Sequence, residues 1–304
     1  IIGNCKSSAL INEDSSIDWC CLPQFDSSAI FCKIIDNHIG GSFKIEADES
    51  YIITQQYINN TAIVRTNFKN EKNEFEVLDF MTRYKLDDQN FYSPPEIQRL
   101  IKPIKGLPKI KVLYNPTLEY ANGKTKTYEK EDFIVSVFDE ASYETLFLYT
   151  DIEKKKILEN KEFELSKSVY LNLSYNEKID LPSLSKSEEE FKKTQEYWLN
   201  WCKKSPSFKS YNKEITRSSI TLKLLTFEKT GAVLAAATTS IPETIGEVRN
   251  WDYRFCWIRD ASMVIKIIAK LGHQRIVKNF IDFIVNLIPN KNEKLQIMYG
   301  LDGQ

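Results

Sequence analysis

The chain changes its hydrophobic period near residue 185, and this change limits the folds open to it. From residue 1 to about residue 180, short runs of β-branched and aromatic residues are separated by turn signals such as Asn59-Asn60 and Asn122-Gly123. The strand-like runs cover residues 51–54, 62–66, 75–78, 109–113, 133–138, 145–149 and 169–173. Many short strands without long helices between them predict an antiparallel β-sandwich over residues 1–184.

Helical patterns follow the strand-like region. Ser185-Lys186-Ser187-Glu188 has the form of a capping box, which predicts a helix that starts at Ser185 and ends at Pro206. We interpret residues 185–211 as a helical linker. In residues 212–304, the spacing of apolar residues predicts three further helices. They run from Lys213 towards Gly231, over residues 261–271, and over residues 275–288 before Pro289.

Composition excludes several classes of protein. Of the 304 residues, 42% are hydrophobic, which is enough to build a sizeable core. A formal net charge of -1 provides no basic field, so we expect no nucleic acid partner. No window approaches the roughly 18 apolar residues of a membrane span. We expect neither membrane insertion nor a signal peptide, which favours a cytoplasmic location, and we leave a homo-oligomer open.

Cysteine and histidine patterns indicate no metal site. The six cysteines form no C-x-x-C pair, and a chain of this length favours reduced, partly buried thiols over a disulfide framework. His38 and His273 have no second ligand at useful spacing, so each is expected at the surface or at a helix end. No glycine-rich phosphate loop occurs either. We therefore expect no metal, nucleotide or flavin cofactor.

Residues 250–262 are the most informative segment for function. These thirteen positions hold two Trp, two Arg, two Asp and one Tyr, directly before an apolar helical run. Arg and Asp are rarely buried without a partner, whereas Trp and Tyr offer flat apolar faces with a polar group at one end. A sugar ring can stack on such faces while its hydroxyls meet charged hydrogen-bonding groups. The segment therefore predicts a carbohydrate site.

The same segment, preceded by Gly246-Glu247-Val248-Arg249, resembles the signature of glycoside hydrolase family 15. This family comprises glucoamylases, glucoamylase-like enzymes of bacteria and archaea, and α,α-trehalases. Other blocks resemble the family in the same order along the chain. They are residues 2–10, 16–27, 78–81, 114–120, the pair Trp198 and Trp201, and residues 295–303.

The resemblance implies a fold and an activity. It implies an N-terminal β-supersandwich, a helical linker, and the first helices of an incomplete (α/α) six-fold toroid. Members of the family release glucose from α-glucans or α,α-trehalose with inversion, using a general acid and a general base on later loops. Those motifs fall beyond Gln304, so we assign no catalytic residue here.

We therefore expect an N-terminal portion of a protein about twice as long, inactive by itself. Apolar residues of the last helix are expected to lack partners: Phe280, Phe283, Ile284, Leu287 and Ile288. The alternative is a non-catalytic module that binds a carbohydrate or a partner chain.

The resemblance also implies roles for the residues of the segment. Arg259 and Asp260 would hold the hydroxyls of a glucose at the non-reducing end, although a structural ion pair at a helix start is the competing interpretation. Trp251 and Tyr253 either stack on the sugar or pack in the core. For Trp257 we favour packing.

The remaining polar residues are expected to support the site. Asp252 and Arg254 would form a pair that holds the loop. For Asp302 we favour a turn role over a place in the pocket. For Asp18-Trp19 and Phe25-Asp26-Ser27 we favour a turn that seals the sandwich over a loop that reaches the ligand.

Overall fold

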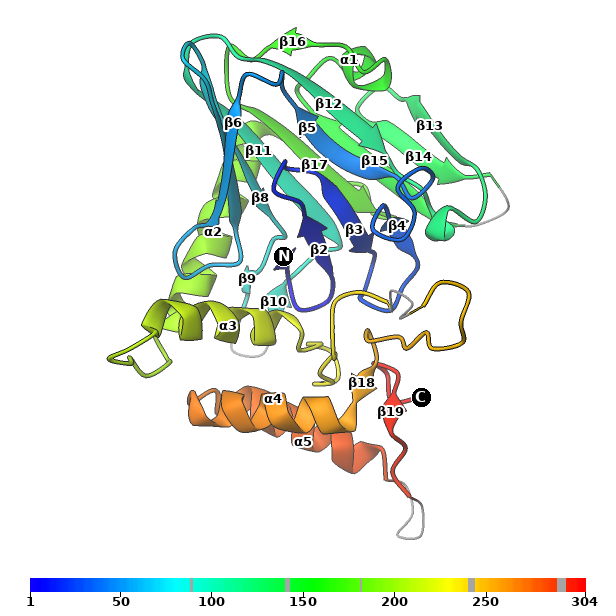
Figure 1. The fold of residues 1–304 in the computed structure, drawn as a ribbon, viewed down its shortest axis with the longest axis vertical. Coiled ribbons are helices and arrows are strands. Elements are labelled where there is room, and N and C mark those ends of the chain that lie inside the picture. The colour runs from blue at the N-terminus through cyan, green and yellow to red at the C-terminus, as the bar shows by residue number, and fades with distance from the viewer. Residues whose placement is uncertain (88–89, 140–142, 181, 240–243, 289–293) are drawn as a thin grey trace.

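The structure is a computed structural model that describes residues 1–87, 90–139, 143–180, 182–239, 244–288 and 294–304. Two antiparallel sheets form its first part (Figure 1). The first sheet has the strand order β1 (Ile2–Gly3), β2 (Ser8–Ile11), β3 (Ile17–Cys21), β5 (Ser42–Glu46), β12 (Lys109–Asn115) and β16 (Phe163–Glu164), with β4 (Ala29–Phe31) against β3. The second has the order β13 (Thr125–Glu129), β14 (Ile134–Phe138), β15 (Thr145–Thr150), β17 (Val169–Tyr175), β11 (Glu96–Lys105), β8 (Glu74–Phe80), β7 (Val64–Lys69) and β6 (Ile52–Tyr57).

The two sheets share one apolar core. β5 and β12 alternate buried and more exposed residues, as strands with one face towards a core do. Phe43 and Val112 of the first sheet join Phe75 and Leu171 of the second in the same buried cluster. The predicted antiparallel β architecture is therefore confirmed. The structure adds the ten-residue strand β11 and the short strands β1 to β5, which the sequence pattern missed.

A buried ion pair ties the two sheets together. Arg99 of β11 lies 2.7 Å from Asp79 of β8 (Nε to Oδ1), and neither side chain is exposed. The same guanidinium donates to the carbonyl oxygens of Phe43 and Ser15 from the first sheet. Burial raises the pKa of Asp79, and the charge of Arg99 opposes this effect. The pair is therefore satisfied by a network that crosses the core.

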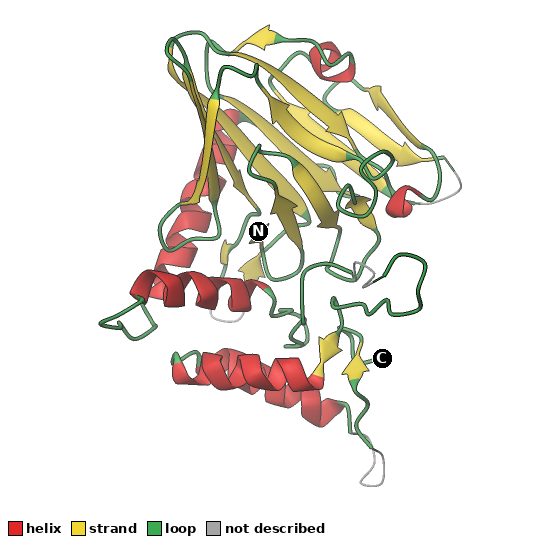
Figure 2. Ribbon diagram, in the orientation of Figure 1, coloured by secondary structure: helices red, strands yellow, loops and turns green. Residues whose placement is uncertain are grey.

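Helix α2 (Leu184–Cys202) lies against the outer face of the second sheet (Figures 1 and 2). Phe191 packs edge-to-face on Phe80 at 5.7 Å between ring centroids. The helix begins at Leu184, and its cap lies two residues earlier than predicted, because Ser183 accepts a hydrogen bond from the Lys186 amide at 3.2 Å. The predicted cap at Ser185 is therefore wrong, and the helix ends at Cys202, before Pro206.

Helices α3 (Asn212–Leu224), α4 (Ile258–Lys270) and α5 (Gln274–Asn286) form the second part of the structure. The last two match the predicted helices within a few residues. The first was predicted to reach Gly231 but ends at Leu224, because residues 225–234 turn back and Thr226 pairs with Val233. Pro289, predicted to stop α5, lies outside the described residues.

The helices bury one apolar face and expose another. Phe280 and Phe283 were expected to lack partners, but they are 6% and 4% exposed and pack in a cluster with Trp198, Phe227 and Ile268. That expectation is wrong for these two rings, because α4 and residues 225–234 cover them. It is also wrong for Ile284 and Leu287, which are partly buried against the same cluster, whereas Ile288, just after α5, is exposed. Other exposed apolar side chains are Met263 and Ile267 on α4, and Ile281 and Val285 on α5. Among the described helices, none has the length and apolarity that crossing a bilayer requires.

Candidate functional site

The segment over residues 250–262 leads from a loop into α4. Cys256 and Trp257 form β18, which pairs with β19 (Met298–Tyr299). α4 starts directly after Trp257, whose extended backbone ends the strand. The short two-stranded sheet therefore fixes the direction in which the segment enters the helix.

Three aromatic rings gather on this loop. Trp257 lies between the other two, with its ring centroid 6.1 Å from that of Trp251 and 6.1 Å from that of Tyr253. The Trp257 indole donates to the carbonyl oxygen of Asp252 at 3.0 Å, which orients the ring. Trp251 is 46% exposed and Tyr253 is 39% exposed, whereas Trp257 is half-buried. Trp257 thus supports two rings that present apolar surface to solvent.

Arg259 and Asp260 lie in the first turn of α4. Their side chains form an ion pair with 3.1 Å between Nη2 and Oδ2, and both remain solvent-accessible, at 74% and 39%. An exposed pair of this kind contributes little to stability, at most about 1 kcal/mol. Neither side chain is buried in the interior, and both are accessible to solvent.

Arg254 and Asp252 form the central polar contact of the loop. The guanidinium of Arg254 faces the Asp252 carboxylate with 2.7 Å between Nη2 and Oδ2, and Nε lies 3.1 Å from Oδ1. The Arg254 backbone amide also donates to Asp252 at 2.9 Å. Burial opposes the charged form of Arg254, but hydrogen bonds and the charge of Asp252 outweigh burial and raise its pKa. Arg254 therefore stays charged and holds the loop closed.

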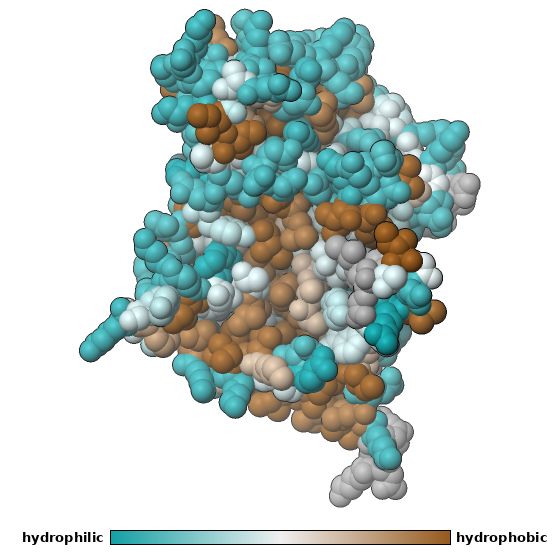
Figure 3. All heavy atoms as spheres, in the orientation of Figure 1, coloured by the Kyte–Doolittle hydropathy of each residue, from teal (hydrophilic) through white to brown (hydrophobic). Residues whose placement is uncertain are grey.

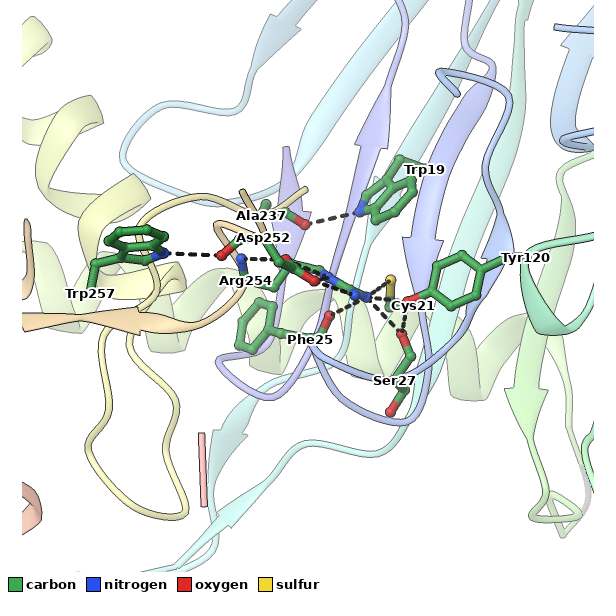
Figure 4. A network of polar contacts seen from close by, with 9 residues as sticks. All are labelled: Trp19, Cys21, Phe25, Ser27, Tyr120, Ala237, Asp252, Arg254 and Trp257. Atoms are coloured by element: carbon green, nitrogen blue, oxygen red, sulfur yellow. Dashed lines mark hydrogen bonds and ion pairs between the residues drawn. The ribbon is translucent and has the colours of Figure 1, made fainter. Parts of the chain in front are cut away.

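The second half of the Arg254 guanidinium reaches the sandwich (Figure 4). Nη1 donates to the Tyr120 hydroxyl at 2.6 Å and to the Ser27 carbonyl oxygen at 2.9 Å. The Cys21 sulfur lies 3.5 Å away, and burial raises the pKa of this thiol to about 12, so it stays protonated. Nearby, the Trp19 indole donates to the carbonyl oxygen of Ala237 at 2.9 Å. The loop is thus anchored on the sandwich.

The turn that carries Tyr120 has an unusual backbone. Glu119, Tyr120 and Ala121 form a 3-10 turn in which all three residues have positive φ, between 52° and 60°. Left-handed backbone costs a non-glycine residue about 1 kcal/mol or more. Contacts at the ends of the side chains offset this cost. Tyr120 meets Arg254 and Ser27, and Glu119 accepts a hydrogen bond from the Ser28 hydroxyl at 2.8 Å.

Comparison with known families decides where the chain belongs. A family model described as "Trehalase-like, N-terminal" matches residues 1–169, and one described as "Glycosyl hydrolases family 15" matches residues 209–304. The chain belongs to glycosyl hydrolase family 15 and has a trehalase-like N-terminal region.

Curated relatives in this family carry the name trehalase. The chain is 31% identical to the trehalase of Thermoplasma acidophilum over 97% of its own length and 51% of the relative's. It is 30% identical to that of Thermoplasma volcanium, over 99% and 48% of the two chains. For the trehalase of Mycobacterium tuberculosis the identity is 26%, over 98% and 48%. The chain therefore spans about half the length of these relatives.

The Arg254 contact joins the two matched regions of this family 15 chain. Residues 18–19 and 25–27 were predicted to seal the sandwich as a turn. The structure shows that they also contact the other region, since Arg254 binds Ser27 and Trp19 binds Ala237. Tyr120 and Cys21 were not predicted as part of this site. The Glu119-Tyr120 block of the sequence was the one signal that could have drawn attention to Tyr120.

Other predicted residues take structural places. Asp302 lies in a turn, as predicted, and its carboxylate is 3.3 Å from Lys229 Nζ. His38 is exposed, and His273 precedes α5, as expected for a helix end. His273 is nevertheless buried, because its ring stacks on Trp201 at 4.0 Å. Within the described ranges, no three His, Cys, Asp or Glu side chains are grouped as metal ligands, and all six cysteines are free thiols.

Proposed function

We propose that the protein containing this chain hydrolyses α,α-trehalose, and that the loop around Trp251 binds one of its glucose rings. The observation that carries the proposal is the exposed aromatic group on a loop anchored to the sandwich, followed in the first turn of α4 by an exposed Arg–Asp pair. Three relatives in the same family are named trehalases, which supports the choice of substrate.

Each residue has a distinct role in this proposal. Trp251 and Tyr253 stack on the apolar face of the glucose ring, because their faces are open to solvent. Arg259 and Asp260 bind ring hydroxyls as donor and acceptor, exchanging part of their mutual contact for contacts with the sugar. Trp257 buttresses the two open rings.

Asp252 and Arg254 hold the loop in place, because Arg254 binds both the Asp252 carboxylate and the Ser27 carbonyl oxygen of the sandwich. The Asp252 carboxylate accepts hydrogen bonds from Arg254 through both of its oxygens. It is therefore engaged in structure and poorly placed to take part in proton transfer. Their role is to position the rings and the Arg259–Asp260 pair.

The catalytic carboxyl groups are proposed to lie outside residues 1–304. Inverting hydrolysis needs an acid and a base about 6.5–9.5 Å apart with a water between base and sugar. Among the described residues of this segment, Asp252 is bound to Arg254 and Asp260 to Arg259, so these two carboxylates do not form such a pair. Helices α3, α4 and α5 are the proposed beginning of an (α/α) toroid whose later loops supply both groups.

An activity panel tests this proposal. The purified 304-residue chain and the whole protein that contains it are each incubated with trehalose, maltose, isomaltose and starch. We expect glucose release from trehalose by the whole protein and none by the 304-residue chain. Proton NMR at early times should show the inverted β-anomer. Release from starch or maltose in preference to trehalose would indicate a glucoamylase, and glucose release by the 304-residue chain would contradict the proposed location of the catalytic groups.

A single substitution tests the stacking role. Trp251→Ala in the whole protein should raise KM for trehalose about tenfold or more, because covering a large exposed apolar side chain with the sugar ring is worth about 1.5–3 kcal/mol. Tyr143→Ala is the matched control, since Tyr143 is an aromatic residue 96% exposed on the sandwich. Equal kinetics for both variants would exclude Trp251 from the substrate site.

A further inference from the structure

A cavity lies away from residues 250–257, which we call the tryptophan loop. It has a volume of about 1020 Å³ and is lined by residues of α2, the end of α3, the turn between α4 and α5, and the two-stranded sheet of β9 (Tyr84–Lys85) and β10 (Phe91–Tyr92). The lower end of α2 and the turn between α4 and α5 lie on the same side of the molecule (Figure 1). None of residues 250–262 lines it. The thirteen-residue helix α4, about 20 Å long, leads from the tryptophan loop to this cavity.

The cavity is strongly basic. Seven Lys and Arg side chains line it, against two carboxylates, Glu196 and Glu228. The Glu228 carboxylate is already neutralised, because the buried guanidinium of Arg83 binds both of its oxygens at 2.6 and 2.8 Å. Burial opposes the charged form of Glu228, but Arg83 outweighs it and lowers the pKa of this carboxyl group. Glu196 is exposed on α2. The lining therefore carries an excess of positive charge.

Lys223 is the side chain that points to a ligand. It is only 8% exposed, yet it lines the cavity, and its ammonium has no hydrogen-bond or ion-pair partner in the part of the chain that the structure describes. Its carbon stem is buried while its ammonium reaches the cavity, where its charge acts on Glu228 and His273. An anion bound in the cavity would meet this ammonium directly. Lys6 and Lys204 line the same cavity, and neither has an ion-pair partner among the described residues.

Other charged groups of the lining are occupied elsewhere. Lys193 pairs with Glu189 at 2.7 Å, and Lys229 pairs with Asp302. Burial lowers the pKa of His273 to about 4, so the ring is neutral near pH 7, and its Nε2 lies 2.8 Å from the Ser205 hydroxyl. Lys85 and Arg275 also have interactions of their own, and Arg275 lies over the Phe91 ring at 5.3 Å. Lys6, Lys204 and Lys223 are therefore the cations of the lining that are available to a ligand. Three ammonium groups match a dianion better than a single carboxylate.

Aromatic side chains complete the lining. Tyr84, Phe91, Tyr197 and Trp201 contribute to the wall, so apolar surface adjoins the cationic groups. Pockets of several hundred Å³ with apolar walls and a few charged groups are typical of small-molecule sites. The volume exceeds what a free phosphate ion needs and leaves room for a ring attached to it.

We propose that this cavity binds a phosphate group carried by a small sugar-like metabolite, with Lys223 as the central contact and Lys6 and Lys204 beside it. Lysine binds phosphate as a mobile point charge, which suits three flexible side chains that line the same cavity. The site is separate from the trehalose site and does not depend on it. The shared chemistry is the phosphate dianion, whose source is either inorganic phosphate or a phosphorylated sugar.

Calorimetric titration of the whole protein with glucose 6-phosphate and with inorganic phosphate tests the proposal. Ionic strength is held constant with sodium chloride, and glucose serves as the uncharged comparison. We expect saturable binding of glucose 6-phosphate, weaker binding of inorganic phosphate and none of glucose. Equal affinity for the two phosphates would identify the free ion as the ligand and overturn the assignment of a sugar-like body.

Variants locate the binding. Lys223→Gln should weaken glucose 6-phosphate binding about tenfold or more, because it removes a charge-assisted contact in a buried position. Lys204→Gln should weaken glucose 6-phosphate binding severalfold. Because Lys204 is exposed, this variant should keep the fold intact, so the test remains valid if Lys223→Gln unfolds. Lys278→Gln on the exposed side of α5 is the matched control and should change affinity less than twofold. Absence of saturable binding, or equal losses in all three variants, would overturn the proposal.

Discussion

The sandwich and the helical region differ in how completely they bury their apolar side chains. In the sandwich, two sheets cover each other's inner faces and α2 covers part of the outer face of the second sheet. In the helical region, α4 and α5 bury one face, while Met263, Ile267, Ile281 and Val285 stay exposed. In Figure 3 hydrophobic atoms gather over the lower, helical part, whereas the surface of the sandwich at the top is mostly hydrophilic. The sandwich thus has its own closed core, and the helical region offers further surface for contact.

The comparison also explains how the candidate site is built. The tryptophan loop belongs to the helical region, but its anchor belongs to the sandwich, because Arg254 reaches Ser27 and Tyr120. A rigid sandwich can thereby position a loop whose own helices are less completely packed. We expect substitutions to have large effects in the sandwich, intermediate effects at the junction and small effects on the exposed helix faces.

The largest expected effect lies inside the sandwich. Asp79→Ala removes the partner of Arg99 and leaves a buried guanidinium without its carboxylate. The free energy of unfolding should fall by about 3–5 kcal/mol, measured by urea denaturation of the 304-residue chain. Lys109→Ala, which breaks an exposed contact with Glu162 at 4.0 Å, is the control and should cost less than about 1 kcal/mol. A similar loss of unfolding free energy in both variants would contradict a larger contribution from the buried Arg99–Asp79 pair than from an exposed pair.

A pH effect is expected where α2 covers the sandwich. Burial raises the pKa of Glu96 on β11 to about 7, and the nearby charge of Glu190 adds to this rise. The pKa of Glu96 in the folded chain therefore lies above its usual value near 4.5, so the folded state holds the proton more tightly than the unfolded state. The stabilisation from this bound proton is complete below about pH 4.5 and is lost as the pH rises through 7.

Glu96→Gln should remove this dependence. The variant should be more stable than the natural chain by about 2–3 kcal/mol at pH 8 and by little at pH 4.5. Gln98 and Asn172, whose amide groups now donate to Glu96, each have an unpaired amide oxygen that can accept from the new glutamine. Urea denaturation at both pH values measures the difference. A gain that is the same at pH 4.5 and pH 8 would contradict the titration of Glu96.

The junction should show an intermediate effect. Arg254→Met removes the contacts of the guanidinium with Asp252, Ser27 and Tyr120, and should cost about 2 kcal/mol of unfolding free energy. Tyr120→Phe removes one hydroxyl and should cost about 1 kcal/mol. In the whole protein, both variants should also lower kcat/KM for trehalose, and Arg254→Met should lower it more than Tyr120→Phe. Unchanged kinetics in Arg254→Met would show that the loop does not need its anchor.

The smallest effect is expected on the exposed face of α5. Val285→Asp should change the stability of the 304-residue chain by no more than about 0.5 kcal/mol, since Val285 is 62% exposed. The same substitution in the whole protein sharpens the comparison. A loss of about 2 kcal/mol or more there would mean that this face is covered in the longer chain, and an equally small effect in both would mean that it stays open.

Regular elements were predictable because they depend on local periodicity. The runs over residues 133–138 and 169–173 became β14 and β17, and the run over 261–271 became α4 within three residues. Strand β11 was missed because Glu96, Gln98 and Arg99 are polar although they are buried, so no alternation marks it. Its buried polar groups find partners on other strands and in the turn at Ser15, which local sequence does not reveal.

The chemistry of the candidate site was predictable only in part. The residue types over 250–262 indicated a sugar site, and the structure brings Trp251, Tyr253 and Trp257 together as that interpretation requires. The anchor was not predictable, because it joins Arg254 to Tyr120 across 134 positions. It also depends on a left-handed turn that no glycine marks. Likewise, Ser183 and Ser185 are equally good caps by residue type, and the structure shows that the Lys186 amide donates to Ser183.

The most direct test of the account is the kinetics of Asp260→Asn with trehalose. In the whole protein, this variant should lose at least about a hundredfold in kcat/KM, because a charged acceptor for the sugar hydroxyls becomes a neutral amide. Its melting temperature should stay within a few degrees, since the Arg259–Asp260 pair is exposed. Asp302→Asn, which removes another exposed ion pair, should change kcat/KM less than twofold. Full activity in Asp260→Asn would contradict the placement of the sugar site on this loop.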